Sequence, residues 1–424
     1  MKVIVANYRF FVDGGPARYL FNFMAAAQKR GIEVIPFSVR NPQNEKTDYA
    51  RYFARQRADM LMYSDTRRSL KNIYGMLRAV TWNFDAAKRL KKLIRDTRPD
   101  AVYILHEINH LSPSIIRAAR KEGVRVVHRI SDFFMFCARY DFLQGDEICE
   151  ECLGGQYSKA IGRRCVKDSR AATCLRVAAM KLYQWNRVFQ DVDMFVVPSA
   201  FTGQKLAEGG ISEKKITHIA TFIDSEAIVP GFFHEKYFLF IGRMVRQKGV
   251  IYAVRAMNEL KNSGYILKIT GTLSEAGEDE ELKRYILEHG LESKVIFTGF
   301  LKGRALEELI SRAACVICPS IWYENMPNTI LEAYAYGKPV VASRLGSLEE
   351  IVEDGYTGFL FPPKDSFALA EQLEKFIQDE DLSARLGKQA RERCEERYGE
   401  DKHMEKLISC LRGEKLGKDG EEYE

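Results

Sequence analysis

Residues 318–333 read CPSIWYENMPNTILEA, and this stretch decides the fold. The apolar run over residues 314–318 predicts a buried β-strand, and Pro327 is typical of the first turn of a helix. Glu324 lies in the predicted loop, and Glu332 lies about one and a half turns into the predicted helix. Parallel α/β sheets bind ligands at the loops after their strands, so the two carboxylates are candidates to accept hydrogen bonds from hydroxyl groups of one ligand. Taken alone, two such glutamates are more often simply exposed.

The rest of the 424-residue chain alternates apolar, strand-like runs with helical patterns. Such alternation predicts an α/β protein with two Rossmann-like, doubly wound parallel sheets, and the length suits two domains of about 200 residues each. Pro230 and Gly231 interrupt the pattern and place the boundary. The predicted domains are residues 1–224 and 236–400, followed by a terminal helix and loose tail over residues 401–424.

Two loops have the composition of anion-binding turns. Gly14 and Gly15 follow the first predicted strand and precede a helix, where backbone N–H groups can approach an anion closely. Residues 242–249 read GRMVRQKG after the first strand of the second domain. Arg243 and Lys248 of this loop can neutralise a diphosphate group.

Taken together, these motifs resemble those of the retaining family 4 nucleotide-sugar glycosyltransferases (glycosyl transferases group 1). The resemblance rests on the Glu-x7-Glu segment and the Gly-Arg…Lys-Gly loop, is loose over residues 1–130 and extends well over residues 194–380. It implies a GT-B fold with the active site in a cleft between two domains, and no metal cofactor for catalysis. It also implies that Arg243 and Lys248 bind the donor diphosphate, Glu324 the sugar and Glu332 the ribose. The full expected donor-binding set is Gly14, Gly15, Arg243, Lys248, Glu324, Asn325, Met326, Asn328, Thr329 and Glu332.

The acceptor side departs from the family pattern. Many members carry His-Asp after the fourth strand, but this chain has Ser131-Asp132 at that place. A serine hydroxyl can hydrogen-bond a sugar but cannot act as an imidazolium ion. We therefore expect His106 or Glu107, after the third predicted strand, to contact the acceptor beside Ser131 and Asp132. His106 joins Glu324, Arg243 and Lys248 as the expected catalytic set.

A cysteine-rich insert over residues 137–174 interrupts the first domain. Cys137, Cys149, Cys152 and Cys165 have the spacing Cys-x11-Cys-x2-Cys-x12-Cys in a glycine-rich segment with few apolar residues. Four thiolates in a poorly cored segment favour a structural zinc ion. Free thiols are the alternative, and an iron–sulfur cluster fits the spacing less well.

Charge is unevenly distributed along the chain. The net charge is +6, with +14 over residues 1–200 and −8 over the remainder. The basic residues concentrate over 51–98 among apolar side chains, which makes this segment a candidate contact for an anionic membrane surface, with two ordinary amphipathic helices as the alternative. No recognised nucleic-acid motif accompanies the charge, so nucleic acid is not an expected partner. The absence of a long apolar run or signal-like start predicts a cytoplasmic protein, with the inner face of the membrane as a peripheral site.

The sequence therefore predicts a retaining hexosyltransferase that moves a sugar from a nucleotide diphosphate-sugar to a glycan or lipid-linked acceptor, in the synthesis of a polysaccharide or glycoconjugate. A nucleotide-sugar epimerase or phosphorylase on the same fold is one alternative. A non-catalytic, transferase-like partner subunit is the other.

Overall fold

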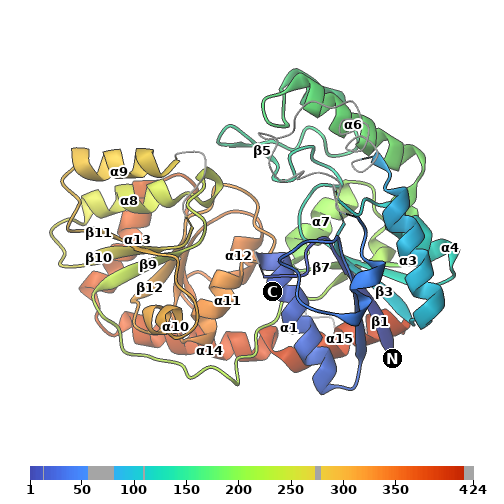
Figure 1. Cartoon of the computed structure of the whole chain (residues 1–424). Helices are drawn as coiled ribbons and strands as arrows, with labels where there is room; N and C mark the ends of the chain where they lie inside the picture. Colours follow the sequence, from blue (N-terminus) through green and yellow to red (C-terminus); the bar gives the residue numbers. More distant parts are fainter. Residues whose placement is uncertain (13, 56–80, 108–109, 273–277, 415–424) are drawn as a thin grey trace.

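The computed structural model describes residues 1–12, 14–55, 81–107, 110–272 and 278–414. The described residues form two lobes that lie side by side, each built around a six-stranded parallel sheet (Figure 1). The prediction of two doubly wound α/β domains is therefore confirmed.

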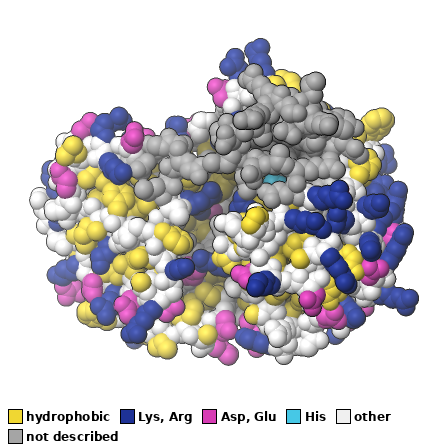
Figure 2. Space-filling model, in the orientation of Figure 1, with side chains coloured by type: hydrophobic (Ala, Val, Ile, Leu, Met, Phe, Trp, Pro, Cys, Tyr) yellow, Lys and Arg dark blue, Asp and Glu magenta, His cyan; other side chains and the backbone are white. Residues whose placement is uncertain are grey.

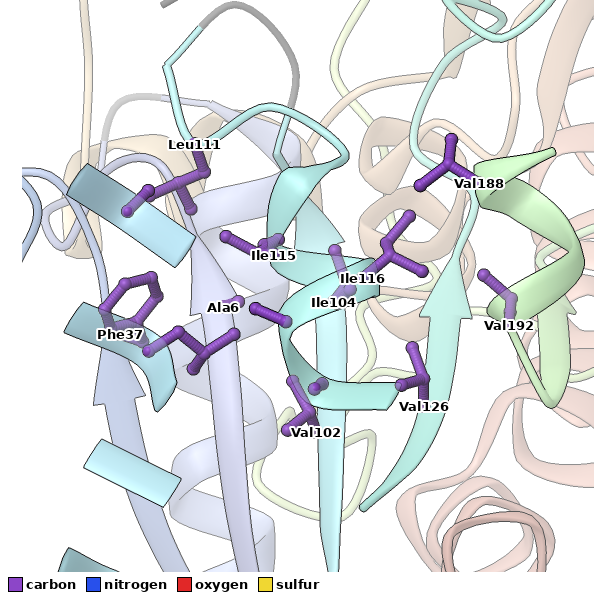
Figure 3. Packing of buried hydrophobic residues seen from close by; sticks show 14 of the residues in the cluster. Ala6, Phe37, Val102, Ile104, Leu111, Ile115, Ile116, Val126, Val188 and Val192 are labelled. Atoms are coloured by element: carbon purple, nitrogen blue, oxygen red, sulfur yellow. The ribbon is translucent and has the colours of Figure 1, made fainter. Parts of the chain in front are cut away.

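The first sheet has the strand order β2-β1-β3-β4-β7-β8, and every neighbouring pair is parallel. Its strands are β1 (Lys2–Asn7), β2 (Glu33–Phe37), β3 (Ala101–His106), β4 (Arg125–Arg129), β7 (Met194–Val197) and β8 (Ile216–His218). Helices cover both faces: α1 (Gly15–Lys29), α3 (Phe84–Thr97), α4 (Ser114–Lys121), α6 (Arg170–Trp185) and α7 (Ala200–Glu208). Branched and aromatic side chains from the strands pack against α4 on one of these faces (Figure 3).

Between β4 and α6 the chain forms the insert, which carries little regular structure. It contains a two-stranded antiparallel hairpin, β5 (Leu143–Gln144) and β6 (Glu147–Ile148), and the short helix α5 (Ser158–Gly162). Phe133, Phe136 and Phe142 are buried in the core of the first domain and anchor the start of this segment.

The second sheet has the order β11-β10-β9-β12-β13-β14 and is also entirely parallel. Its strands are β9 (Tyr237–Ile241), β10 (Ile266–Thr270), β11 (Val295–Gly299), β12 (Cys315–Cys318), β13 (Val340–Ser343) and β14 (Gly358–Phe361). The helices are α8 (Val250–Glu259), α9 (Glu278–Glu288), α10 (Arg304–Ser311), α11 (Asn328–Ala335), α12 (Ser347–Ile351), α13 (Ser366–Gln378) and α14 (Leu382–Tyr398). β12 is buried throughout, which explains its uninterrupted apolar sequence.

The last described helix, α15 (Glu400–Arg412), leaves the second lobe and packs on the first (Figure 1). Its apolar face, which includes Met404 and Leu407, is buried in one cluster with Val3 and Tyr103 of the first sheet. The sequence placed this segment outside both domains, whereas the helix belongs to the core of the first. Residues 415–424 of the predicted tail lie outside the described residues.

Candidate functional site between the two domains

Glu324 lies buried in the loop between β12 and α11, and one of its oxygens accepts three hydrogen bonds. The donors are Lys248 Nζ at 2.7 Å, Ser320 Oγ at 2.7 Å and Trp322 Nε1 at 2.8 Å. Burial alone would raise the pKa of Glu324, but the Lys248 ammonium and the two neutral donors hold it below its usual value. Glu324 is therefore an ionised carboxylate that forms an ion pair with Lys248.

The loop that carries Lys248 is packed tightly against the Glu324 loop. The short 3-10 helix η4 (Arg246–Lys248) ends at Gly249, whose φ is 65°. A Cβ atom at this glycine would lie 1.9 Å from the carbonyl oxygen of Pro319. The backbone N–H of Ile321 also donates to the carbonyl of Gln247 at 3.0 Å. Only glycine permits this approach, so the backbone itself brings Lys248 to Glu324.

Glu332 lies on α11 and forms an ion pair with Arg18 of α1, which joins the two domains. Burial raises the pKa of Glu332, and the Arg18 guanidinium opposes that rise. Gly15 lies against the start of α11, since a Cβ atom there would be 3.9 Å from Asn328 Nδ2. The structure thus brings the predicted glycine turn to the predicted ribose carboxylate. Sequence reasoning missed Arg18, one turn into the helix that follows the glycines.

Three other residues of the predicted donor set contact protein in this structure. The Asn325 side chain accepts a hydrogen bond from Thr202 Oγ1 at 3.0 Å, and the Met326 sulfur accepts one from the backbone N–H of Thr221 at 3.1 Å. Thr329 Oγ1 approaches the carbonyl of Ile241 at 3.5 Å. Asn325 and Met326 therefore hold the loop against the first domain.

On the first domain, His106 ends β3 and faces Asp132. His106 Nε2 lies 3.1 Å from Asp132 Oδ2, and both side chains are less than one-fifth exposed. Burial lowers the pKa of His106, but the Asp132 and Glu107 carboxylates outweigh it, so the pKa is raised overall. Ser131 donates to the Leu105 carbonyl at 2.7 Å and supports the same turn.

Glu107 does not occupy the acceptor position predicted for it. Its side chain is 1% exposed and lies 2.8 Å from His128 Nε2 inside the first domain. Successive side chains along a strand point to opposite sides, and Glu107, directly after His106, points inward to His128. A direct contact between Glu107 and an acceptor is therefore not supported.

Side chains from both domains converge beside Arg243. Burial raises the pKa of Tyr8 and of Tyr140, and in both cases the Arg243 guanidinium opposes that rise, which places it near both phenols. Tyr8 packs edge-on against His106 with 4.8 Å between ring centroids, and Tyr140 packs edge-on against Trp322 at 6.2 Å. The His106–Asp132 pair and the Lys248–Glu324 pair thus face the same region. Neither tyrosine has a motif that could have identified it from sequence.

The zinc prediction for the insert is not supported. No group of three or more His, Cys, Asp or Glu among the described residues has the arrangement of a metal site. Burial raises the pKa of the Cys137 thiol to about 11, and burial together with the neighbouring Cys137, Cys165 and Cys149 raises that of Cys152 to about 12. Arg163 donates to Cys149 Sγ at 3.3 Å, and Cys165 Sγ donates to Gln144 at 3.6 Å. None of the four forms a disulfide, and Cys152 and Cys165 pack with Ala138, Tyr157 and Ala160 in a small apolar cluster of the insert.

The predicted membrane contact over residues 51–98 falls partly outside the described residues, which omit 56–80. Lys and Arg side chains gather on the side of the first domain where α3 and α4 lie (Figure 2). On α3, however, Arg89 pairs with Asp85 at 3.0 Å, and Arg95 pairs with Glu122 at 2.7 Å. These acids neutralise part of the surface, and membrane contact there is not supported. None of the described helices combines the length and the apolar character of a membrane span.

Comparison with known proteins gives the family. Residues 13–227 match the family model described as Glycosyltransferase Family 4, and residues 228–393 match Glycosyl transferases group 1. The chain belongs to glycosyltransferase family 4. The match to the first family model spans half of the chain, and together the two models cover nearly all of both lobes.

Individual relatives are distant. An uncharacterized glycosyltransferase of Methanocaldococcus jannaschii is 30% identical over 42% of this chain and 45% of its own length. The alpha-D-kanosaminyltransferase of Streptomyces kanamyceticus is 30% identical over 36% of this chain and 39% of its own length. Each match thus spans less than half of the curated relative. The crystal structure of Anabaena HepE in complex with UDP shares 16% identity, covers 97% of this chain and 100% of its own, and has a TM-score of 0.65. This likeness confirms the GT-B fold expected of the family.

Proposed function

We propose that this protein is a retaining glycosyltransferase that moves a hexosyl group from a nucleotide diphosphate-sugar to a hydroxyl of a glycan or lipid-linked acceptor. The observation that carries the proposal is the Lys248–Glu324 pair. It lies in a loop of the family's donor motif, and Tyr8, Tyr140 and Arg243 connect it to the His106–Asp132 pair of the other domain.

On the donor side, Arg243 and Lys248 both bind the diphosphate leaving group. The Arg243 guanidinium and the Lys248 ammonium bind the diphosphate and stabilise the negative charge that develops as the glycosidic bond breaks. Glu324 accepts hydrogen bonds from sugar hydroxyls through the oxygen that the protein donors leave unused. Glu332 accepts from the ribose hydroxyls, which then replace Arg18 as its partner.

On the acceptor side, we assign to His106 the role of the family's usual histidine, whose place in the sequence is taken by Ser131. Asp132 orients the ring and stabilises its protonated form. An imidazolium beside the reacting centre donates to a hydroxyl of the transferred sugar. Retention of configuration is part of this proposal, as is a role in polysaccharide or glycoconjugate synthesis. The similarity to a kanosaminyltransferase and to a protein solved with UDP supports the substrate class.

The first test is a thermal-shift series with nucleoside diphosphates and their sugars, because a ligand that binds only the native state raises its stability. One nucleotide should raise the melting temperature, and Glu332→Ala should abolish that shift. Glu280→Ala on α9 is the matched control, because it removes an exposed carboxylate of the same domain. No shift with any nucleotide would contradict the proposal.

Product analysis then tests the reaction. Incubation of the stabilising nucleotide-sugar with candidate acceptors should release the nucleoside diphosphate, and the anomeric proton coupling of the product should match the configuration of the donor. An inverted product would contradict retention. Conversion of the donor sugar without any acceptor would instead indicate an epimerase.

A further inference from the structure

The cysteine-rich insert reaches the second domain through a short hairpin, residues 143–148, which we name the insert hairpin. Asp146 at its turn accepts hydrogen bonds from Nε and Nη2 of Arg246 through both carboxylate oxygens. Its neighbour Glu147 pairs with Lys364 Nζ at 2.6 Å. Two successive acids of the first domain therefore hold two cations of the second.

Arg246 is the first residue of η4, and Lys248 is the last. The loop is thus held at one end by Asp146 and at the other by the bond from Lys248 to Glu324. Three cations, Arg243, Arg246 and Lys248, occur within six residues, and like charges this close repel one another. A carboxylate on Arg246 offsets that repulsion.

The insert also contacts the loop that carries Glu324. Tyr140 packs edge-on against Trp322 at 6.2 Å between ring centroids, and Phe142 packs edge-on against Tyr323 at 6.2 Å. Trp322 in turn donates to Glu324. Both loops that meet at the Lys248–Glu324 pair are therefore in contact with one segment of the first domain.

We propose that Asp146 is a positioning residue for the donor diphosphate. By pairing with Arg246 it fixes the loop so that the charges of Arg243 and Lys248 remain directed at the donor. This inference rests on the proposed function, because it assumes that the loop binds a diphosphate. The insert, which is not part of the family's motifs, thereby takes part in positioning the phosphate-binding loop.

The test measures the dissociation constants of uridine diphosphate and guanosine diphosphate, each by calorimetry. Asp146→Asn keeps the shape of the side chain and removes its charge. It should weaken binding by about two- to fivefold, the range expected for a partly exposed ion pair. Glu147→Gln is the control, since its partner Lys364 lies outside the phosphate loop, and it should leave binding unchanged.

A charge exchange separates positioning from a merely structural role. The double variant Asp146→Arg with Arg246→Asp restores the pair in reverse, and it should bind more tightly than Arg246→Asp alone. Wild-type affinity in Asp146→Asn, equal losses in Asp146→Asn and Glu147→Gln, or no recovery in the exchange would each overturn the inference. If the wild-type protein binds neither these two nor any other nucleoside diphosphate of the thermal-shift series, the proposed function itself fails.

Discussion

Gly249 offers the sharpest test of how the donor loop is built. Replacement by alanine places a methyl group 1.9 Å from the Pro319 carbonyl oxygen, at a backbone φ of 65°. Ordinary contact begins near 3.5 Å, so the two loops must separate by about 1.5 Å. The left-handed conformation costs a non-glycine residue about 1–2 kcal/mol, and overpacking adds about 1–3 kcal/mol.

Gly264 supplies a matched control in the same domain. Its φ is 79°, but a Cβ atom there meets nothing within 4 Å. Gly264→Ala should therefore show the conformational cost alone. The melting temperature of Gly249→Ala should lie below that of the control by about 2–12 °C, because 1 kcal/mol shifts a domain of this size by roughly 2–4 °C.

Binding should separate the two variants further. Separation of the two loops moves Lys248 away from the proposed diphosphate site, so Gly249→Ala should bind its nucleoside diphosphate at least about tenfold more weakly, a loss of about 1.4 kcal/mol. Gly264→Ala should bind as the wild type does. Equal melting temperatures and equal affinities for the two variants would refute the reasoning, since the close approach would then have no consequence.

Three further outcomes are expected. Lys248→Ala leaves a buried carboxylate without its cation and should cost about 3–5 kcal/mol at pH 7. The pKa of Glu324 is lowered in the native protein, so the stability that the pair contributes is present above the unfolded pKa and is lost as pH falls. Denaturant titrations should therefore show a smaller difference in unfolding free energy between Lys248→Ala and the wild type at pH 4 than at pH 7. Asp132→Asn should lower the pKa of His106, measured by NMR titration. Because the native pKa of His106 is raised, its contribution is present below the unfolded pKa near 6.5 and lost at higher pH, so this variant should be destabilised more at pH 5.5 than at pH 8. Arg18→Ala removes the cation that competes with a ribose at α11, so calorimetry should show nucleotide affinity kept or increased up to about fivefold; a severe loss would mean that Arg18 itself binds the donor.

Local patterns predicted the parallel sheets, and they located two loops that the structure brings together. The apolar run of β12 and the proline before α11 located Glu324, and the glycines around Arg243 and Lys248 located its partner loop. These features depend on the period of burial and on backbone conformation, which a single sequence carries directly.

Two ion pairs between the domains were not predicted. Arg18 meets a carboxylate 314 positions away, and Asp146 meets a guanidinium 100 positions away. No spacing rule reports such pairs, because the relative placement of two domains decides them. Two predictions made from local spacing alone also failed: Glu107 lies 2.8 Å from His128 inside the first domain, and the cysteine spacing indicated a zinc site that the described residues do not support.

The return of α15 to the first domain affects the order in which this protein can fold. A ribosome releases residues 1–224 long before residues 400–412, yet Met404, Leu407 and Cys410 complete the core that contains Val3 and Tyr103. The core of the first domain therefore keeps an apolar surface uncovered until α15 has been synthesised. Removal of residues 400–412 would uncover the core of the first domain, which is the domain farthest from them in sequence, so this domain cannot be expressed alone without α15.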